Sequence, residues 1–194
     1  YLHHAQPTTL GHYLFTFAQP MLRDFERIES FYSRLDISPA GSGSVNGSSL
    51  PLNRERVAEL LAFKKISKHA RDSMWQPDIP MEAAFLLISS MTNLSRLCEE
   101  LIIWNSSEFD YVELPDEFCR TSVIMPQKKN PYALAYIRGL SCHVSGLVGE
   151  FSTLGRGVSG FPDSRTFIYD TLPMSFVKVE GAISLLSALL NKIK

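Results

Sequence analysis

The chain has 194 residues, of which 45% are hydrophobic, and its formal net charge is −1. This composition is ordinary for a water-soluble globular protein and is sufficient for a sizeable core. A charge this close to zero creates no field that would recruit nucleic acid or a membrane surface, so we expect neither as a partner.

Four segments carry apolar residues at alternating steps of three and four, which is the spacing of one face of an α-helix. Sustained over this length, the period predicts long helices that pack nearly parallel, at roughly 20° to one another. Strand signals are weak, so we predict an all-α fold built as a long-helix bundle, and we interpret the residues of all four stripes as core. The stripes are Leu14, Ala18, Met21, Phe25, Ile28, Tyr32 and Leu35; Ala84, Leu87, Met91, Leu94, Cys98 and Leu101; Ile137, Leu140, Val144, Leu147, Phe151 and Leu154; and Phe176, Val179, Ile183, Leu186, Leu190 and Ile193.

Prolines indicate where two of these helices bend or begin. Pro20 lies within the first stripe and predicts a kink near Thr16, because its ring would meet the carbonyl four residues earlier. Residues 54–63 are expected to form a shorter helix. Pro80 indicates the start of the next long helix, with Asp78 as one possible N-cap.

Three irregular stretches separate the helices, namely residues 38–53, 105–130 and 155–173. The first contains the run Gly-Ser-Gly-Ser-Val-Asn-Gly at residues 41–47. This run fits either a flexible linker or a nest of backbone amides that binds an anion. Composition alone favours the linker.

Other features restrict the class of protein. Cys98, Cys119 and Cys142 show no metal-ligand spacing, and their odd number argues against a disulfide framework, so we expect no metal and a reducing, cytoplasmic location. The sequence shows no uninterrupted apolar run of bilayer length and no signal peptide. Because the chain starts at Tyr1 without methionine and ends inside an apolar-periodic segment, we interpret residues 1–194 as one central helical-bundle domain of a longer polypeptide that lacks its N- and C-terminal regions.

The most informative polar group is the run Thr-Ser-Val-Ile-Met-Pro-Gln-Lys-Lys-Asn-Pro at residues 121–131. It places the Ser122 hydroxyl, the ammonium groups of Lys128 and Lys129 and the Asn130 amide close together. A buried core would not hold such groups unpaired, whereas an anion site would use them as donors. Pro131 suits the first turn of the helix that follows.

This run resembles the signature loop of the fumarase/aspartase superfamily, and its Met-Pro-Gln-Lys-Lys-Asn-Pro form is most similar to argininosuccinate lyases. Further matches occur in the family's order and spacing, so the resemblance covers residues of about 5 to about 140 and implies the superfamily's long-helix bundle. These matches are Ala5-Gln6-Pro7, Arg23-Asp24-Phe25-Glu26-Arg27, Gly41-Ser42-Gly43, Arg71-Asp72, Leu94-Ser95-Arg96 and Glu99-Glu100-Leu101.

The resemblance implies a β-elimination that cleaves a C–N bond of an N-substituted aspartate and releases fumarate, with argininosuccinate as the default substrate and arginine as the other product. Ser122 is then the base that removes the proton beside a carboxylate. Lys128 and Asn130 hold that carboxylate as charge develops on it. Gln6 and Met125 are further substrate-binding residues by this resemblance. The substrate carboxylate is the electron sink, so no cofactor is required.

Each of these residues also has a plain structural interpretation. Ser122 could be a loop or capping hydroxyl, Lys128 and Lys129 a solvated pair, and Asn130 the N-cap of the next helix. Only their ordered occurrence with Met125 and Pro126 favours the functional interpretation.

Two departures from the family pattern concern the leaving group. Tyr1 stands where relatives commonly carry a histidine, and Ala135 stands where they carry the glutamate that orients it. Loss of both together avoids an unpaired buried group. Either Tyr1, or His3 or His4 from a neighbouring turn, supplies the acid, or the elimination chemistry is weakened or lost.

A third departure concerns the amine half of the substrate. The family's Tyr-Asn-x-Asp-Leu-Gln-Glu-Asp-Lys stretch is replaced by residues 160–170, in which Asp163, Arg165, Tyr169 and Asp170 are polar candidates. Two alternatives therefore remain: a related amino-acid lyase with a different amine product, and a catalytically silent structural homologue.

The stripes carry more apolar surface than one chain can cover, so we predict a homo-oligomer. The resemblance implies a homotetramer in which loops of several subunits share each active site. The predicted partners are thus a small-molecule dicarboxylate substrate and further copies of the chain.

Overall fold

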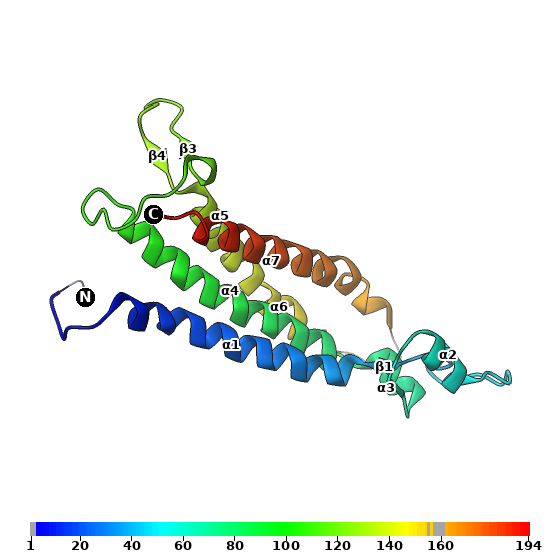
Figure 1. The fold of residues 1–194 in the computed structure, drawn as a ribbon. Coiled ribbons are helices and arrows are strands. Elements are labelled where there is room, and N and C mark those ends of the chain that lie inside the picture. The colour runs from blue at the N-terminus through cyan, green and yellow to red at the C-terminus, as the bar shows by residue number, and fades with distance from the viewer. Residues whose placement is uncertain (1–2, 155, 157–161) are drawn as a thin grey trace.

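Long helices dominate the computed structural model, which describes residues 3–154, 156 and 162–194. The three longest are α1 (Leu10–Leu35), α4 (Asp78–Trp104) and α7 (Ile168–Leu190), and they form the middle of the molecule with α4 packed against both of the others (Figure 1). Two consecutive helices, α5 (Tyr132–Ser145) and α6 (Leu147–Phe151), lie alongside α4. The predicted all-α fold is confirmed.

Short elements gather at the two ends of these helices (Figure 1). At one end lie α2 (Arg54–Leu60), α3 (Ala70–Trp75) and a parallel pair of strands, β1 (Ile37–Ser38) and β2 (Lys65–Ile66). At the other end, the antiparallel strands β3 (Arg120–Thr121) and β4 (Lys129–Asn130) form a hairpin. Two 3₁₀ turns complete the described elements, η1 (Asp116–Phe118) and η2 (Pro162–Arg165).

The core is centred on α4, which packs against α1, α5, α6 and α7. Met91 and Cys98 of α4 and Leu134 and Ile137 of α5 are completely buried. Burying one such side chain contributes roughly 1.5–3 kcal/mol, so this seam supplies much of the stability. The second and third apolar stripes are buried throughout, as predicted.

Helix α1 contacts α4 with a face that the sequence pattern did not single out. Phe17, Asp24 and Phe31 recur at seven-residue intervals and are the buried residues of α1. The Asp24 carboxylate accepts hydrogen bonds from Arg27 Nη1, Ser89 Oγ and Asn93 Nδ2, each 2.7 Å long. Two of these donors belong to α4, so a buried polar cluster joins the two helices.

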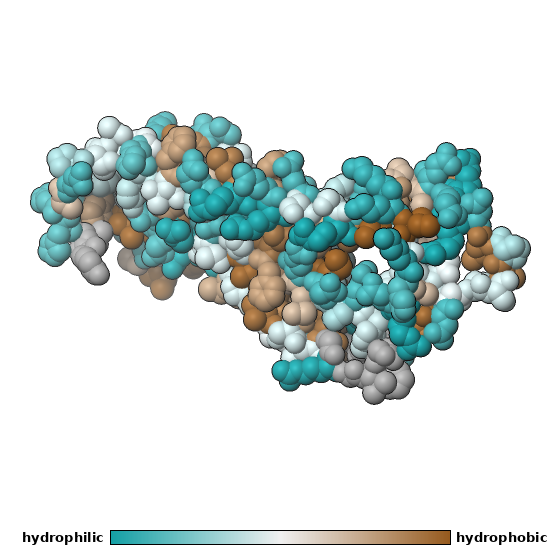
Figure 2. All heavy atoms as spheres, turned by 90° about the horizontal axis from the view of Figure 1, so that it is seen from below, coloured by the Kyte–Doolittle hydropathy of each residue, from teal (hydrophilic) through white to brown (hydrophobic). Residues whose placement is uncertain are grey.

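The prediction that every stripe residue is core is wrong for much of α1 and half of α7, because no other part of the described chain covers those faces. Figure 2 shows hydrophobic side chains on the surface of the molecule seen from below. The exposed stripe residues are Leu14, Ala18, Phe25, Ile28, Tyr32 and Leu35 of α1 and Phe176, Ile183 and Leu190 of α7.

Several predicted boundaries need correction. The cap of α4 is Pro77, with no side-chain hydrogen bond, so Asp78 is the first helical residue rather than the cap, while Pro80 lies in the first turn. Helix α2 ends at Leu60, before the predicted residue 63. Helix α1 continues through Pro20, and the predicted kink near Thr16 stays a prediction. The third stripe spans two helices that meet at Gly146, where an added Cβ would lie 3.1 Å from the His143 carbonyl oxygen.

The predicted irregular stretch extended to residue 173, but helix α7 begins at Ile168, five residues earlier, and includes Pro173. With 23 residues and a mean hydropathy of 1.4 over its most apolar window, it is long and apolar enough to cross a bilayer by those two measures alone. Asp170, Lys178 and Glu180 interrupt its apolar residues, so the statement that the sequence has no uninterrupted apolar run of bilayer length still holds. One face of α7 nevertheless packs into the core through Val179, Ala182 and Leu186.

Candidate active site

The signature run forms the β3–β4 hairpin at one end of the bundle (Figure 1). Arg120 pairs with Asn130 and Thr121 with Lys129. The Ser122 amide then donates to the Lys128 carbonyl oxygen at 3.1 Å, which places these two residues opposite each other. A tight turn closes the hairpin, since the Lys128 amide donates to the Met125 carbonyl oxygen at 3.0 Å. The structure therefore brings Ser122, Lys128 and Asn130 into one hairpin.

Ser122 is half-buried at the start of this turn. Its Oγ accepts a hydrogen bond of 3.2 Å from the Met125 amide. A hydroxyl that accepts from a backbone amide keeps its own proton available for another acceptor. The capping interpretation of Ser122 and the base interpretation are thus both compatible with its geometry.

The cations and the amide of the hairpin have different environments. Lys129 forms an ion pair with Asp116, and this hydrogen bond raises the pKa of Lys129 above its ordinary value. Lys128 is exposed and has no side-chain partner among the residues that the structure describes. The Asn130 amide donates to the Arg120 carbonyl oxygen at 3.3 Å. Lys128 is therefore the cation of the pair that is available to an added anion.

The structural alternative that assigned Asn130 as a helix N-cap is wrong. Helix α5 begins at Tyr132, and the capping position is Pro131, which makes no side-chain capping bond. Asn130 instead belongs to β4. Pro131 consequently precedes the first turn rather than occupying it.

The tip of the hairpin is apolar and open to solvent. Val123 is 91% exposed and Ile124 88% exposed, while Met125 is 45% exposed. Exposing the apolar surface of β-branched side chains to water is unfavourable, and at a loop tip this cost is removed only when another surface covers them. In a single chain, the candidate site is thus an open hairpin without a second wall.

The N-terminal candidates are only partly described. Gln6, His3 and His4 are exposed, and none of them contacts the hairpin through an ion pair or hydrogen bond within the described part of the chain. Tyr1 lies outside the described residues. Ala135 is exposed on α5, close in sequence to the hairpin, and its methyl group offers no acid or base.

The loop at residues 41–47 lies at the opposite end of the long helices from the hairpin (Figure 1). Gly41, Gly43 and Gly47 adopt positive φ, and the Gly47 amide donates to the Ser42 carbonyl oxygen at 2.8 Å. Arg54 donates to the Ala40 carbonyl oxygen at 2.9 Å. These bonds give the loop a defined structure, which argues against a flexible linker, while anion binding by its backbone amides stays a prediction.

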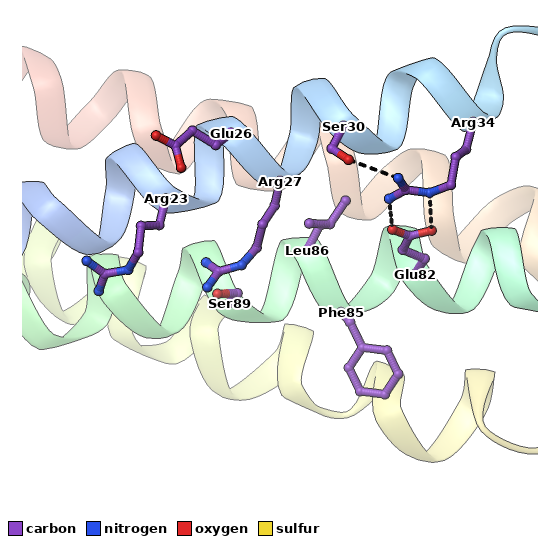
Figure 3. Close-up of a pocket in the computed structure, with 9 residues that line it drawn as sticks. All are labelled: Arg23, Glu26, Arg27, Ser30, Arg34, Glu82, Phe85, Leu86 and Ser89. Carbon is purple, nitrogen blue, oxygen red and sulfur yellow. Dashed lines mark hydrogen bonds and ion pairs between the residues drawn. The ribbon is translucent and has the colours of Figure 1, made fainter.

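Two pockets lined in part by arginine were not predicted from the sequence. A groove of about 660 Å³ between α1 and α4 is lined by Arg23, Arg27 and Arg34, with Arg34 paired to Glu82 (Figure 3). The spacing of these arginines at four and seven residues was a signal for one cationic helix face. A second pocket contains Arg165 and Tyr169, two of the polar candidates named within residues 160–170, but the sequence did not predict that they would line a pocket with α3 and α4. Among residues 3–154, 156 and 162–194, no cluster of three His, Cys, Asp or Glu side chains could hold a metal ion.

The fold and the hairpin define a class. Comparison with solved structures gives a TM-score of 0.91 to a variant of EDDS lyase with bound fumarate, at 30% identity over 99% of this chain and 38% of that one. A class II fumarase from Schistosoma mansoni gives a TM-score of 0.78 at 15% identity over 98% of this chain and 45% of that one, which supports the fold alone. The molecule is therefore a helical bundle of the fumarase/aspartase type.

The sequence comparisons are more specific. The family model described as "Lyase" matches residues 1–146, so the chain belongs to this lyase family. It is 44% identical over 146 residues to an argininosuccinate lyase of Methanothermobacter thermautotrophicus, covering 75% of this chain and 31% of that protein. It is 37% identical over 196 residues to an argininosuccinate lyase of Natranaerobius thermophilus, covering 98% of this chain and 39% of that protein. The resemblance to argininosuccinate lyases is confirmed, and the chain spans less than half the length of these relatives.

Proposed function

We propose that this chain supplies part of the active site of a carbon–nitrogen lyase that releases fumarate from an N-substituted aspartate. Argininosuccinate, which would give arginine and fumarate, is the substrate that the names of the relatives favour. Ser122 removes the proton beside a carboxylate, and Lys128 and Asn130 stabilise the negative charge that develops there. Fixed donors aimed at developing charge are often the largest contribution to catalysis.

The observation that carries this proposal is the register of the β3–β4 hairpin. It sets Ser122 opposite Lys128, with the Asn130 amide two residues further along the same strand. Lys128 is exposed and without an acidic partner in the described structure, whereas its neighbour Lys129 is neutralised by Asp116. A base, a cation and an amide on one hairpin match the requirements of abstracting a weakly acidic proton.

A complete site requires more than one chain in this proposal. Helix α1 has 26 residues and is about 39 Å long, and its two ends carry the N-terminal segment and the loop at residues 41–47. The hairpin therefore cannot share a pocket with that loop within one subunit. A homotetramer, in which loops of several subunits meet, would bring them together and would also cover the exposed stripes of α1 and α7.

The amine half of the substrate is open to a second candidate. The likeness to EDDS lyase, at a TM-score of 0.91, favours a related amino-acid lyase with a different amine product. A panel of N-succinyl amines that includes argininosuccinate separates the two candidates, because only the true substrate yields fumarate at a substantial rate. Fumarate is followed by its ultraviolet absorbance.

Replacing Ser122 by alanine tests the assigned base. We expect Ser122→Ala to lower kcat by at least about 100-fold, the contribution typical of a positioned general base, without changing the thermal unfolding midpoint. Ser33→Ala is the matched control, because this exposed serine bonds only to the Ser30 carbonyl oxygen of its own helix. A Ser122→Ala protein with full turnover would refute the base assignment.

The silent-homologue alternative rests on Tyr1 and Ala135 standing where relatives carry the histidine and glutamate pair, since Ala135 supplies no carboxylate beside the hairpin. It predicts that no member of the substrate panel yields fumarate, with or without Ser122. Turnover by the natural sequence that disappears in Ser122→Ala would exclude this alternative.

A further inference from the structure

Arg165 is a buried cation without a described hydrogen-bond or ion-pair partner. The residue is only 8% exposed, and its Nε has no hydrogen-bond acceptor. Within residues 3–154, 156 and 162–194, no acidic side chain forms an ion pair with it. A buried guanidinium with an unpaired donor is costly, so such groups normally have an anionic or hydrogen-bonding partner.

The position of the guanidinium is fixed by an aromatic ring. Its Cζ lies 5.3 Å from the centroid of the Trp75 ring, on α3. Arginine stacks well on aromatic rings while the edge of its planar fork remains free to donate. Trp75 therefore orients Arg165 without satisfying its hydrogen bonds.

Arg165 lines a pocket of about 310 Å³ between α3 and the first turns of α4 and α7. Ile79 and Pro80 come from α4, and Ile168 and Tyr169 from α7. Neither helix has a side-chain N-cap, and both present the positive end of a long helix dipole to this region. The buried arginine and the two helix ends thus favour negative charge in the same pocket.

The remaining walls restrict the ligand further. Met74, Leu172 and Pro173 are apolar, and Ser73 and Gln76 add two neutral polar groups. Asp78 and Asp170 do not line the pocket, but they lie in the first turns of the two helices, where their negative charge disfavours an anion that carries two full charges. A single guanidinium in a largely apolar pocket suits one carboxylate attached to an apolar chain, because the fork can bind both of its oxygens.

We propose that this pocket, formed by Arg165, Trp75 and the N-terminal turns of α4 and α7, binds a small organic monocarboxylate. The pocket lies at the end of the bundle opposite the β3–β4 hairpin within the chain. Arg165 and Tyr169 belong to the stretch that replaces the family's amine-binding segment, so binding is measured directly rather than through turnover and is thereby scored separately from the lyase activity proposed above.

Tryptophan fluorescence provides the measurement, because the chain contains only Trp75 and Trp104. Hexanoate is titrated into the protein, with hexanol as the uncharged probe of the same chain length and inorganic phosphate as the probe without an apolar chain. We expect a saturable change with hexanoate, binding of hexanol weaker by about tenfold or more, and no saturable change with phosphate. Trp75→Phe should remove the signal.

Variants of the guanidinium assign the site. Arg165→Gln should weaken hexanoate binding by about tenfold or more, as expected for loss of a charge-assisted hydrogen bond. Arg56→Gln is the matched control, because this exposed arginine pairs with Glu59 on α2, outside the pocket. Equal affinity for hexanol and hexanoate in the natural protein would overturn the proposal even if Arg165→Gln failed to fold. Unchanged hexanoate binding by a folded Arg165→Gln protein, or no saturable binding at all, would also overturn it.

Discussion

The buried cluster around Asp24 makes the sharpest prediction about stability. Asp24 is 3% exposed and accepts three hydrogen bonds, two of them from Ser89 and Asn93 on the neighbouring α4. Replacing it by alanine removes the shared acceptor and leaves two donors unpaired between packed helices. Each unsatisfied buried group costs roughly 1–3 kcal/mol, so we expect Asp24→Ala to lower the free energy of unfolding by about 3 kcal/mol.

The third partner, Arg27, should contribute far less. Its side chain is 53% exposed, so its ion pair with Asp24 is screened by solvent. We expect Arg27→Met to cost below about 1 kcal/mol, as is usual for such pairs. Urea unfolding followed by circular dichroism at 222 nm measures both variants, with equal m-values as the condition for comparing them.

A double-mutant cycle tests the mechanism itself. In a background that carries Ser89→Ala and Asn93→Leu, the donors are gone, and removal of Asp24 should cost much less than in the natural sequence. If Arg27→Met were as costly as Asp24→Ala, or if the cost of Asp24→Ala were unchanged in that background, the reasoning from buried donors would be refuted.

Two further predictions concern the loop at residues 41–47 and the core thiol. Gly43 has φ +60°, and an added Cβ would lie 2.4 Å from the Gly47 carbonyl oxygen, so Gly43→Ala should lower the thermal unfolding midpoint. Gly47→Ala has open space at φ +79° and should lower it less; an equal effect of both variants would contradict the steric argument. Burial raises the pKa of the Cys98 thiol from 9.0 to about 12. Above about pH 9, the unfolded chain therefore loses a proton that the folded chain keeps. The free energy of unfolding consequently falls as pH rises from about 9 to about 12. Cys98→Ala should show a shallower decline in unfolding free energy over this range than the exposed-thiol control Cys142→Ala; parallel declines would contradict the assignment.

The sequence predicted the helices and the hairpin residues better than it predicted which surfaces are covered. The second stripe, from Ala84 to Leu101, is entirely core because α4 has helices on several sides. In α1, the same period describes a face that the chain leaves open, while Phe17 and Phe31 form the internal contact. Periodicity shows that a helix has an apolar face, but it carries no information on whether the covering surface belongs to the same chain.

The candidate site shows the same limit at the level of single residues. Ser122, Lys128 and Asn130 were predictable because they form one short ordered motif, which the backbone closes into a hairpin. Arg165 and Trp75 are 90 positions apart, and only the packing of α3 beside the N-terminus of α7 brings them together. Contacts between distant parts of a chain depend on tertiary packing, which no local pattern encodes.

Because the hairpin and the loop at residues 41–47 lie at opposite ends of the long helices, the length of those helices sets the distance between them. An extra residue within α1 or α4 would advance everything beyond it by about 1.5 Å and rotate it by about 100°. In an assembly in which several copies each contribute one end to a shared site, this displacement would occur in every site. We therefore expect an inserted residue within α1 or α4 to disturb a shared site more than one inserted into an end loop outside the hairpin and residues 41–47.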